Sequence, residues 1–149
     1  MDKFLTEIHN SLGITQQHLD ATKLSMHAQP ALTDLEVVDI DFEGRPFILI
    51  SSAAAAWNKM KEAAAAEQIT LLPFSGFRSY IHQKKLIERH LKNDRKIEDI
   101  LRHIAIPGFS EHHSGRAIDI HADGQAILSE EFELTNERSE EHTSELQSH

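Results

Sequence analysis

The segment from Ser110 to Asp119 is the strongest constraint on how this chain folds. Apolar residues bracket Asp119 within residues 117–120, which predicts a short buried strand. A carboxylate in such a strand is costly unless a partner compensates for its lost hydration. His112 lies seven positions earlier, and Gly115 between them permits a tight turn. The segment therefore predicts a turn that aims a histidine and a carboxylate at one point.

This pair has two interpretations. Catalytic zinc typically takes three protein ligands and a water, and His112 and Asp119 would supply two of the ligands. The alternative is a direct hydrogen bond between the two side chains that braces a loop. Spacing alone does not choose between them. The chain has no cysteine, so any metal must be held by His, Asp or Glu.

Size and composition limit the class of protein. A chain of 149 residues, 40% of them hydrophobic, with only six Gly and four Pro, is long enough for one folded globular domain. The net charge of −9 argues against a nucleic-acid partner. No apolar run approaches the length of a membrane span. Among the eleven histidines, the N-terminal His9, His18 and His27 are predicted to lie on the surface.

The residue pattern predicts an α+β fold, with helices packed on a small, largely antiparallel sheet. Ser51 or Ser52 is expected to cap the second of the predicted helical regions, and Trp57 is expected to anchor the core. The expected elements are helices within residues 1–35, a hairpin of strands 36–41 and 46–50, a helix over 53–68, a strand over 69–75, helices over 79–91 and 97–104, and the strand 117–120.

Arg78 is the second candidate functional residue. It follows an apolar strand and precedes a helix for which Ser79 is a natural N-cap. A guanidinium at such a place suits a carboxylate or a developing oxyanion. The alternative is an ion pair with one of the chain's many acidic residues.

Two segments together resemble one known family. They are Pro73-Phe74-Ser75-Gly76-Phe77-Arg78-Ser79-Tyr80 and the segment from Ser110 to Asp119. The VanY-type zinc D-alanyl-D-alanine carboxypeptidases, of the LAS group of metallopeptidases, show Ser-Gly-aromatic-Arg-Ser followed by Ser-x-His-x-x-Gly-x-Ala-x-Asp. This chain fills every fixed place of the second motif. The resemblance extends over about residues 35–135 and implies an LAS-metallopeptidase-like fold.

The resemblance also implies a site and a reaction. His112 and Asp119 would bind Zn²⁺, and Arg78 would bind the substrate carbonyl or terminal carboxylate and stabilise the oxyanion. Gln83 and Ser110 would line the substrate pocket. A zinc-activated water would cleave the amide before a terminal D-alanine of a short peptide or peptidoglycan stem peptide.

One part of the family pattern is absent from these 149 residues. Family members complete the site with Glu-x-x-Trp-His, whose Glu is the general base and whose His is the third zinc ligand, whereas the only tryptophan here is Trp57. His121 shares a strand face with Asp119, but the family does not use it. We therefore expect an impaired enzyme with two zinc ligands and no base.

The C-terminal residues 138–149 resemble the translation of a sequencing-library adapter. We expect a truncated carboxypeptidase-like domain over 1–137 and a non-native tail over 138–149, which makes Glu141, His142 and His149 poor candidates for base and ligand.

Two other functions remain open. One is a non-catalytic peptide or cell-wall binding module in which Arg78 holds a carboxylate, and the other is a structural domain that binds no zinc. The N-terminus shows no secretory signal, which predicts a cytoplasmic protein, whereas a peptidoglycan substrate favours the cell envelope.

Overall fold

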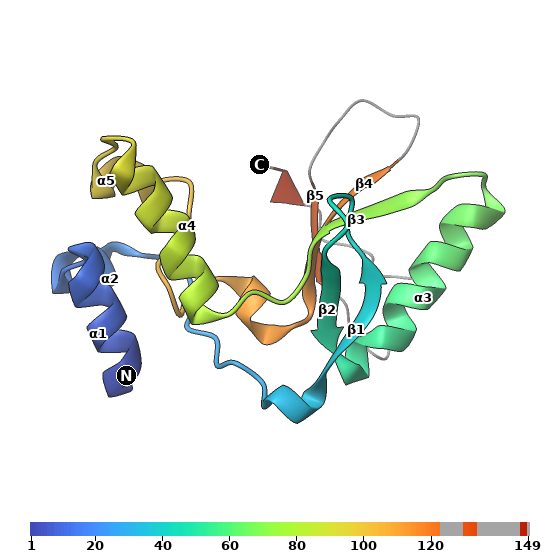
Figure 1. Cartoon of the computed structure of the whole chain (residues 1–149), viewed down its shortest axis with the longest axis horizontal. Coiled ribbons are helices and arrows are strands. Elements are labelled where there is room, and N and C mark those ends of the chain that lie inside the picture. Colours follow the sequence, from blue (N-terminus) through green and yellow to red (C-terminus); the bar gives the residue numbers. More distant parts are fainter. Residues whose placement is uncertain (123–129, 134–146, 149) are drawn as a thin grey trace. The chain divides into compact units, whose positions relative to one another are not determined.

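The structure is a computed structural model that describes residues 1–122, 130–133 and 147–148 (Figure 1). The chain forms two compact units. The helical unit comprises Met1–Gln29 and Arg78–His113, and the sheet unit comprises Pro30–Phe77 and Ser114–His149. Helices and small antiparallel sheets confirm the predicted α+β class. Within the described ranges, no helix has both the length and the apolar character that crossing a bilayer requires.

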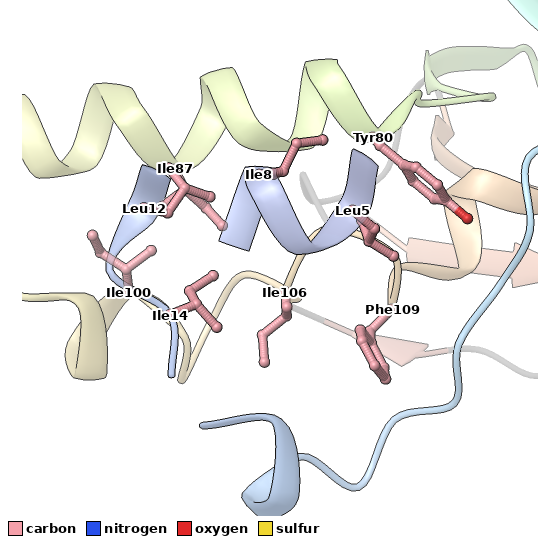
Figure 2. Close-up of a cluster of buried hydrophobic side chains, with 9 residues drawn as sticks. All are labelled: Leu5, Ile8, Leu12, Ile14, Tyr80, Ile87, Ile100, Ile106 and Phe109. Carbon is pink, nitrogen blue, oxygen red and sulfur yellow. The ribbon is translucent and has the colours of Figure 1, made fainter. Parts of the chain in front are cut away.

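The helical unit is built around one apolar cluster (Figure 2). Its helices are α1 (Lys3–Leu12), α2 (Gln16–Ala21), α4 (Tyr80–Lys92) and α5 (Ile97–Ile100). Ser79 caps α4 as predicted, because its side chain accepts a hydrogen bond from the His82 amide at 3.0 Å. The buried side chains of the cluster are Leu5, Ile8, Leu12, Ile14, Tyr80, Ile87, Ile100, Ile106 and Phe109.

His9 is buried, so the prediction that it lies on the surface is wrong. Its side chain is 2% exposed, and Nε2 donates to the carbonyl of Pro107 at 2.7 Å. The position belongs to the apolar stripe of α1, since it lies four residues after Leu5 and three before Leu12. A polar residue at helical spacing within such a stripe is expected to face the core.

The described residues of the sheet unit form two antiparallel sheets instead of the one predicted. Their strands pair in the orders β1-β2 and β3-β4-β5-β6. The elements are the 3-10 turn η1 (Leu32–Asp34), β1 (Leu35–Ile40), β2 (Pro46–Ile50), α3 (Ser51–Ala66), β3 (Leu71–Ser75), β4 (Ala117–Ala122), β5 (Glu130–Glu133) and β6 (Gln147–Ser148).

Trp57 anchors the core of the sheet unit, as predicted. Its side chain is fully buried, and Nε1 donates to the Asp39 carboxylate at 3.1 Å, so its one polar atom is satisfied. Lys61 also donates to Asp39, at 2.8 Å. The other buried members of this cluster are Phe47, Leu49, Ala53, Ala56, Met60, Ile118 and Ile120.

The start of α3 differs from the prediction. The helix begins at Ser51 itself, Ile50 occupies the N-cap position, and no side chain within the described part of the protein caps it. Ile50 is the last residue of β2, and its amide donates to the carbonyl of Gly115 at 2.9 Å. Because the strand leads directly into the helix, neither serine occupies the capping position.

The pairing of β3 with β4 places Asp119 in the sheet. Ser75 lies opposite Asp119, beyond an irregularity in the register after Pro73. Ile118 and Ile120 pack into the Trp57 cluster. Since successive strand residues alternate between faces, Asp119 points to the opposite face and is half-buried. The strand is therefore apolar on one face only, which lowers the cost of the carboxylate.

Asp41 organises the hairpin turn between β1 and β2. Its carboxylate accepts hydrogen bonds from the amides of Glu43 and Arg45, each at 2.9 Å, and from Nε of Arg45 at 3.0 Å. Burial raises the pKa of Asp41, but these hydrogen bonds outweigh burial and hold the pKa below the ordinary value of 3.8.

We predict that Asp41→Asn loses a pH-dependent part of the folding free energy. A lowered folded-state pKa stabilises the protein above the unfolded-state pKa, and this contribution disappears as the pH falls through the folded-state value. The gap in thermal-unfolding midpoint between wild type and variant should therefore be largest near neutral pH and shrink below about pH 4. Asp34→Asn, at an exposed site, is the control. A gap that is constant from pH 7 to pH 3 would contradict the prediction.

We predict that Gly115→Ala destabilises the fold more than Gly44→Ala. Both glycines have left-handed backbones, with φ of +77° and +81°, so both substitutions carry the same conformational cost of about 1 kcal/mol. A Cβ at Gly115 would lie 3.0 Å from the Ile50 amide nitrogen, whereas one at Gly44 would meet no described residue within 4 Å. Urea unfolding of the two variants measures the difference. Equal losses would show that the close backbone approach is not important.

Candidate functional site

The structure distributes the five predicted site residues over both units. Arg78, Gln83, Ser110 and His112 belong to the helical unit, where hydrogen bonds connect them. Asp119 belongs to β4 of the sheet unit.

Arg78 is half-buried and is held at its backbone and at its guanidinium. Its amide donates to the carbonyl of His112 at 3.0 Å. Its Nη1 donates to Oε1 of Gln83 at 3.3 Å. Gln83 is itself 1% exposed, and its Nε2 donates to the carbonyl of Ala105 at 2.8 Å. The Gln83 amide thus orients one side of the guanidinium from within the core of the helical unit.

Ser110 and His112 lie at the start of the 3-10 turn η2 (Glu111–Ser114). Both side chains are buried, and the hydroxyl of Ser110 accepts a hydrogen bond from the His112 amide at 3.2 Å. The serine therefore shapes the turn that presents the histidine.

His113 is a fully buried residue to which the sequence pattern assigned no role. The amide of Gly108 donates to its Nε2 at 3.0 Å, and its Nδ1 is 2.7 Å from the carbonyl of Arg78. Burial lowers the pKa of His113 to about 4, so the ring is neutral near pH 7. Its position beside the motif histidine, after a Pro-Gly turn, was the only sequence signal for it.

Asp119 and His121 share one face of β4. The Nδ1 atom of His121 is buried and has no hydrogen-bond partner among the residues that the structure describes, and its ring lies 5.8 Å from that of Phe74. Imidazole and carboxylate are both ordinary zinc donors, so the chemistry of His112 and Asp119 fits a zinc ion. Across residues 1–122, 130–133 and 147–148, however, no three His, Asp or Glu side chains are grouped to hold a metal.

The predicted boundary after residue 137 falls outside the described residues, and so do Glu141, His142 and His149.

The fold and these motifs are those of a peptidase family. The family model for VanY, D-alanyl-D-alanine carboxypeptidase, matches residues 47–148, and the chain belongs to this family.

Relatives agree with this assignment. The chain is 36% identical over 94 residues to "Putative carboxypeptidase YodJ" of Bacillus subtilis (strain 168), a match that covers 59% of this chain and 33% of the relative. A solved structure of the LdcB LD-carboxypeptidase, described as revealing the molecular basis of peptidoglycan recognition, matches with a TM-score of 0.55 and 30% identity. That match covers 64% of this chain and 45% of the LdcB chain. The chain thus spans a third to a half of the length of these relatives.

A solved structure of the vancomycin resistance D,D-pentapeptidase VanY, an E175A mutant in complex with Zn(II), is similar at 24% identity and a TM-score of 0.48. The match covers 66% of this chain and 58% of that chain.

We predict that Gln83→Leu destabilises the helical unit. Leucine is similar in size but leaves the carbonyl of Ala105 and Nη1 of Arg78 without the hydrogen bonds that Gln83 makes. Loss of buried hydrogen bonds of this kind costs about 1–3 kcal/mol. Chemical denaturation measures the loss. Gln17→Leu, at an exposed position of α2, is the matched control and should change stability by less than about 0.5 kcal/mol. Equal effects of the two substitutions would refute the prediction.

Proposed function

We propose that this protein is a zinc-dependent carboxypeptidase that removes a terminal D-alanine from peptidoglycan-type peptides. The observation that carries the proposal is the hydrogen bond from the Arg78 amide to the His112 carbonyl, at 3.0 Å. It joins the arginine of the first family motif to the histidine of the second within one compact unit. Membership of the D-alanyl-D-alanine carboxypeptidase family supports the same reaction.

In this proposal His112 and Asp119 hold the zinc ion, with one imidazole nitrogen and one carboxylate as donors. Bound zinc would supply a water of lowered pKa and polarise the scissile carbonyl. Because only a neutral imidazole is a ligand, protons compete with zinc for the site.

Arg78 would bind the substrate. Its guanidinium is suited to the terminal carboxylate of the peptide, or to the oxyanion that forms during amide cleavage. Gln83 accepts a hydrogen bond from Nη1 and so helps to orient the guanidinium. Ser110 shapes the turn that carries His112. We assign Gln83 and Ser110 to the lining of the proposed substrate pocket.

We also propose that a protein of these 149 residues hydrolyses its peptide substrate slowly. The family's Glu-x-x-Trp-His segment, with the general base and third ligand, is not in the sequence. Residues 1–137 would form the family domain and residues 138–149 a non-native tail. Two donors without a base allow the peptide to bind but hydrolyse it poorly.

The test measures binding and hydrolysis separately. Calorimetric titration of the full chain measures the affinity for D-alanyl-D-alanine and for L-lysyl-D-alanine, each with and without zinc. A separate assay of free D-alanine measures hydrolysis. We expect zinc-dependent binding and release close to background. We expect His112→Ala and Asp119→Ala to abolish the zinc dependence, and Arg78→Ala to weaken peptide binding by about tenfold or more.

His103→Ala, at an exposed position, is the control and should behave as wild type. Peptide binding that is indifferent to zinc would favour a non-catalytic binding module instead. Failure to bind either peptide would refute the proposed function. Rapid release of D-alanine that chelator and His112→Ala both abolish would refute the impairment while supporting the enzyme.

A further inference from the structure

The ring of His113 connects two segments of the helical unit through both of its nitrogens. An amide N–H can only donate, so the Gly108 amide at 3.0 Å requires Nε2 to be an acceptor. Nδ1 must then carry the proton, and it donates to the carbonyl of Arg78 at 2.7 Å. Both ring nitrogens are thus used, and this assignment defines the neutral Nδ1–H tautomer.

The ring has little freedom to move. Its side chain is fully buried, and the ring of Tyr80 contacts it edge to face, with centroids 4.7 Å apart and an interplanar angle of 89°. Tyr80 is itself fixed, because its hydroxyl donates to the carbonyl of His27 at 2.6 Å and its amide donates to Oε1 of Gln29 at 2.6 Å. The histidine is therefore a rigid support for the Arg78 carbonyl.

Arg78 is consequently held on both sides of its Cα atom. Its amide is bonded to the carbonyl of His112, and its carbonyl is bonded to Nδ1 of His113. Two adjacent residues of one motif therefore fix the two peptide planes that flank the arginine. Those planes determine the direction in which its long side chain leaves the backbone, while Gln83 contacts the guanidinium end.

We propose that His113 is a positioning residue for Arg78, and that its Nδ1–H···O=C bond sets the orientation of the guanidinium for a substrate carboxylate. This inference rests on the proposed function, since it assumes that Arg78 binds the peptide terminus. A planar, bidentate contact tolerates only small errors in the position of the guanidinium. A purely structural role would require only that the buried ring nitrogens be satisfied.

Two substitutions separate these roles. In His113→Asn the side-chain NH₂ takes the place of Nδ1–H, so the bond to Arg78 is retained and the acceptor for Gly108 is lost. In His113→Gln the side-chain oxygen takes the place of Nε2, so the Gly108 bond is retained and the donor to Arg78 is lost. Each variant loses one buried hydrogen bond, so the two should lose similar stability in urea unfolding.

The primary readout is the ¹⁵N-correlated NMR signal of the Arg78 Nε–H group in the full chain, with the exposed Arg89 as internal control. We expect His113→Asn to keep the wild-type Arg78 signal and His113→Gln to move it toward the position typical of a free arginine. The Arg89 signal should stay in place in both variants. Equal displacement of the Arg78 signal in the two variants, or none in either, would overturn the proposal.

The second readout is the affinity for D-alanyl-D-alanine. We expect His113→Gln to weaken binding about tenfold and His113→Asn to change it less than about threefold. An unchanged affinity of His113→Gln would overturn the link to substrate binding. If wild type binds no peptide, the proposed function fails on its own, and the NMR comparison still decides whether His113 positions Arg78.

Discussion

The antiparallel pairing of β3 with β4 is the constraint on which the two family motifs depend. This pairing sets Ser75 opposite Asp119. The first motif therefore begins in β3, next to the strand that carries the last residue of the second motif. Arg78 follows Ser75 by three residues, and Asp119 is fixed within its own strand. A slip of one residue would turn Asp119 toward the apolar face of Ile118, where an ionised carboxylate is unfavourable. Packing of Ile118 and Ile120 against Trp57 therefore fixes the register.

In the helical unit, hydrogen bonds hold the arginine to which we assign substrate binding. Arg78 is held through the carbonyl of His112, the ring of His113 and the amide of Gln83. A guanidinium held in this way loses little further freedom when an anion binds. This arrangement supports the proposed role of Arg78 in binding a carboxylate.

The sequence predicted most of the fold because its local signals agree with one another. The hairpin, the cap at Ser79 and the core role of Trp57 all follow from periodicity and capping rules, and the structure has them. The start of α3 and the burial of His9 were mispredicted. Each depends on what the segment packs against, which a local pattern does not contain: Ile50 is bound to Gly115, and His9 to Pro107.

For the site, the sequence supplied the candidates: Arg78, Ser110, His112 and Asp119 stand in two motifs typical of the family, and Gln83 lies three positions after the first motif. Only folding brings His113 to the two groups that it bonds. Its two partners, Gly108 and Arg78, lie five and thirty-five positions away along the chain. In the sequence, a neutral, buried histidine that is bonded at both nitrogens cannot be told apart from a metal-binding or a surface histidine. The difference arises from burial and hydrogen-bond partners, which exist only once the chain has folded.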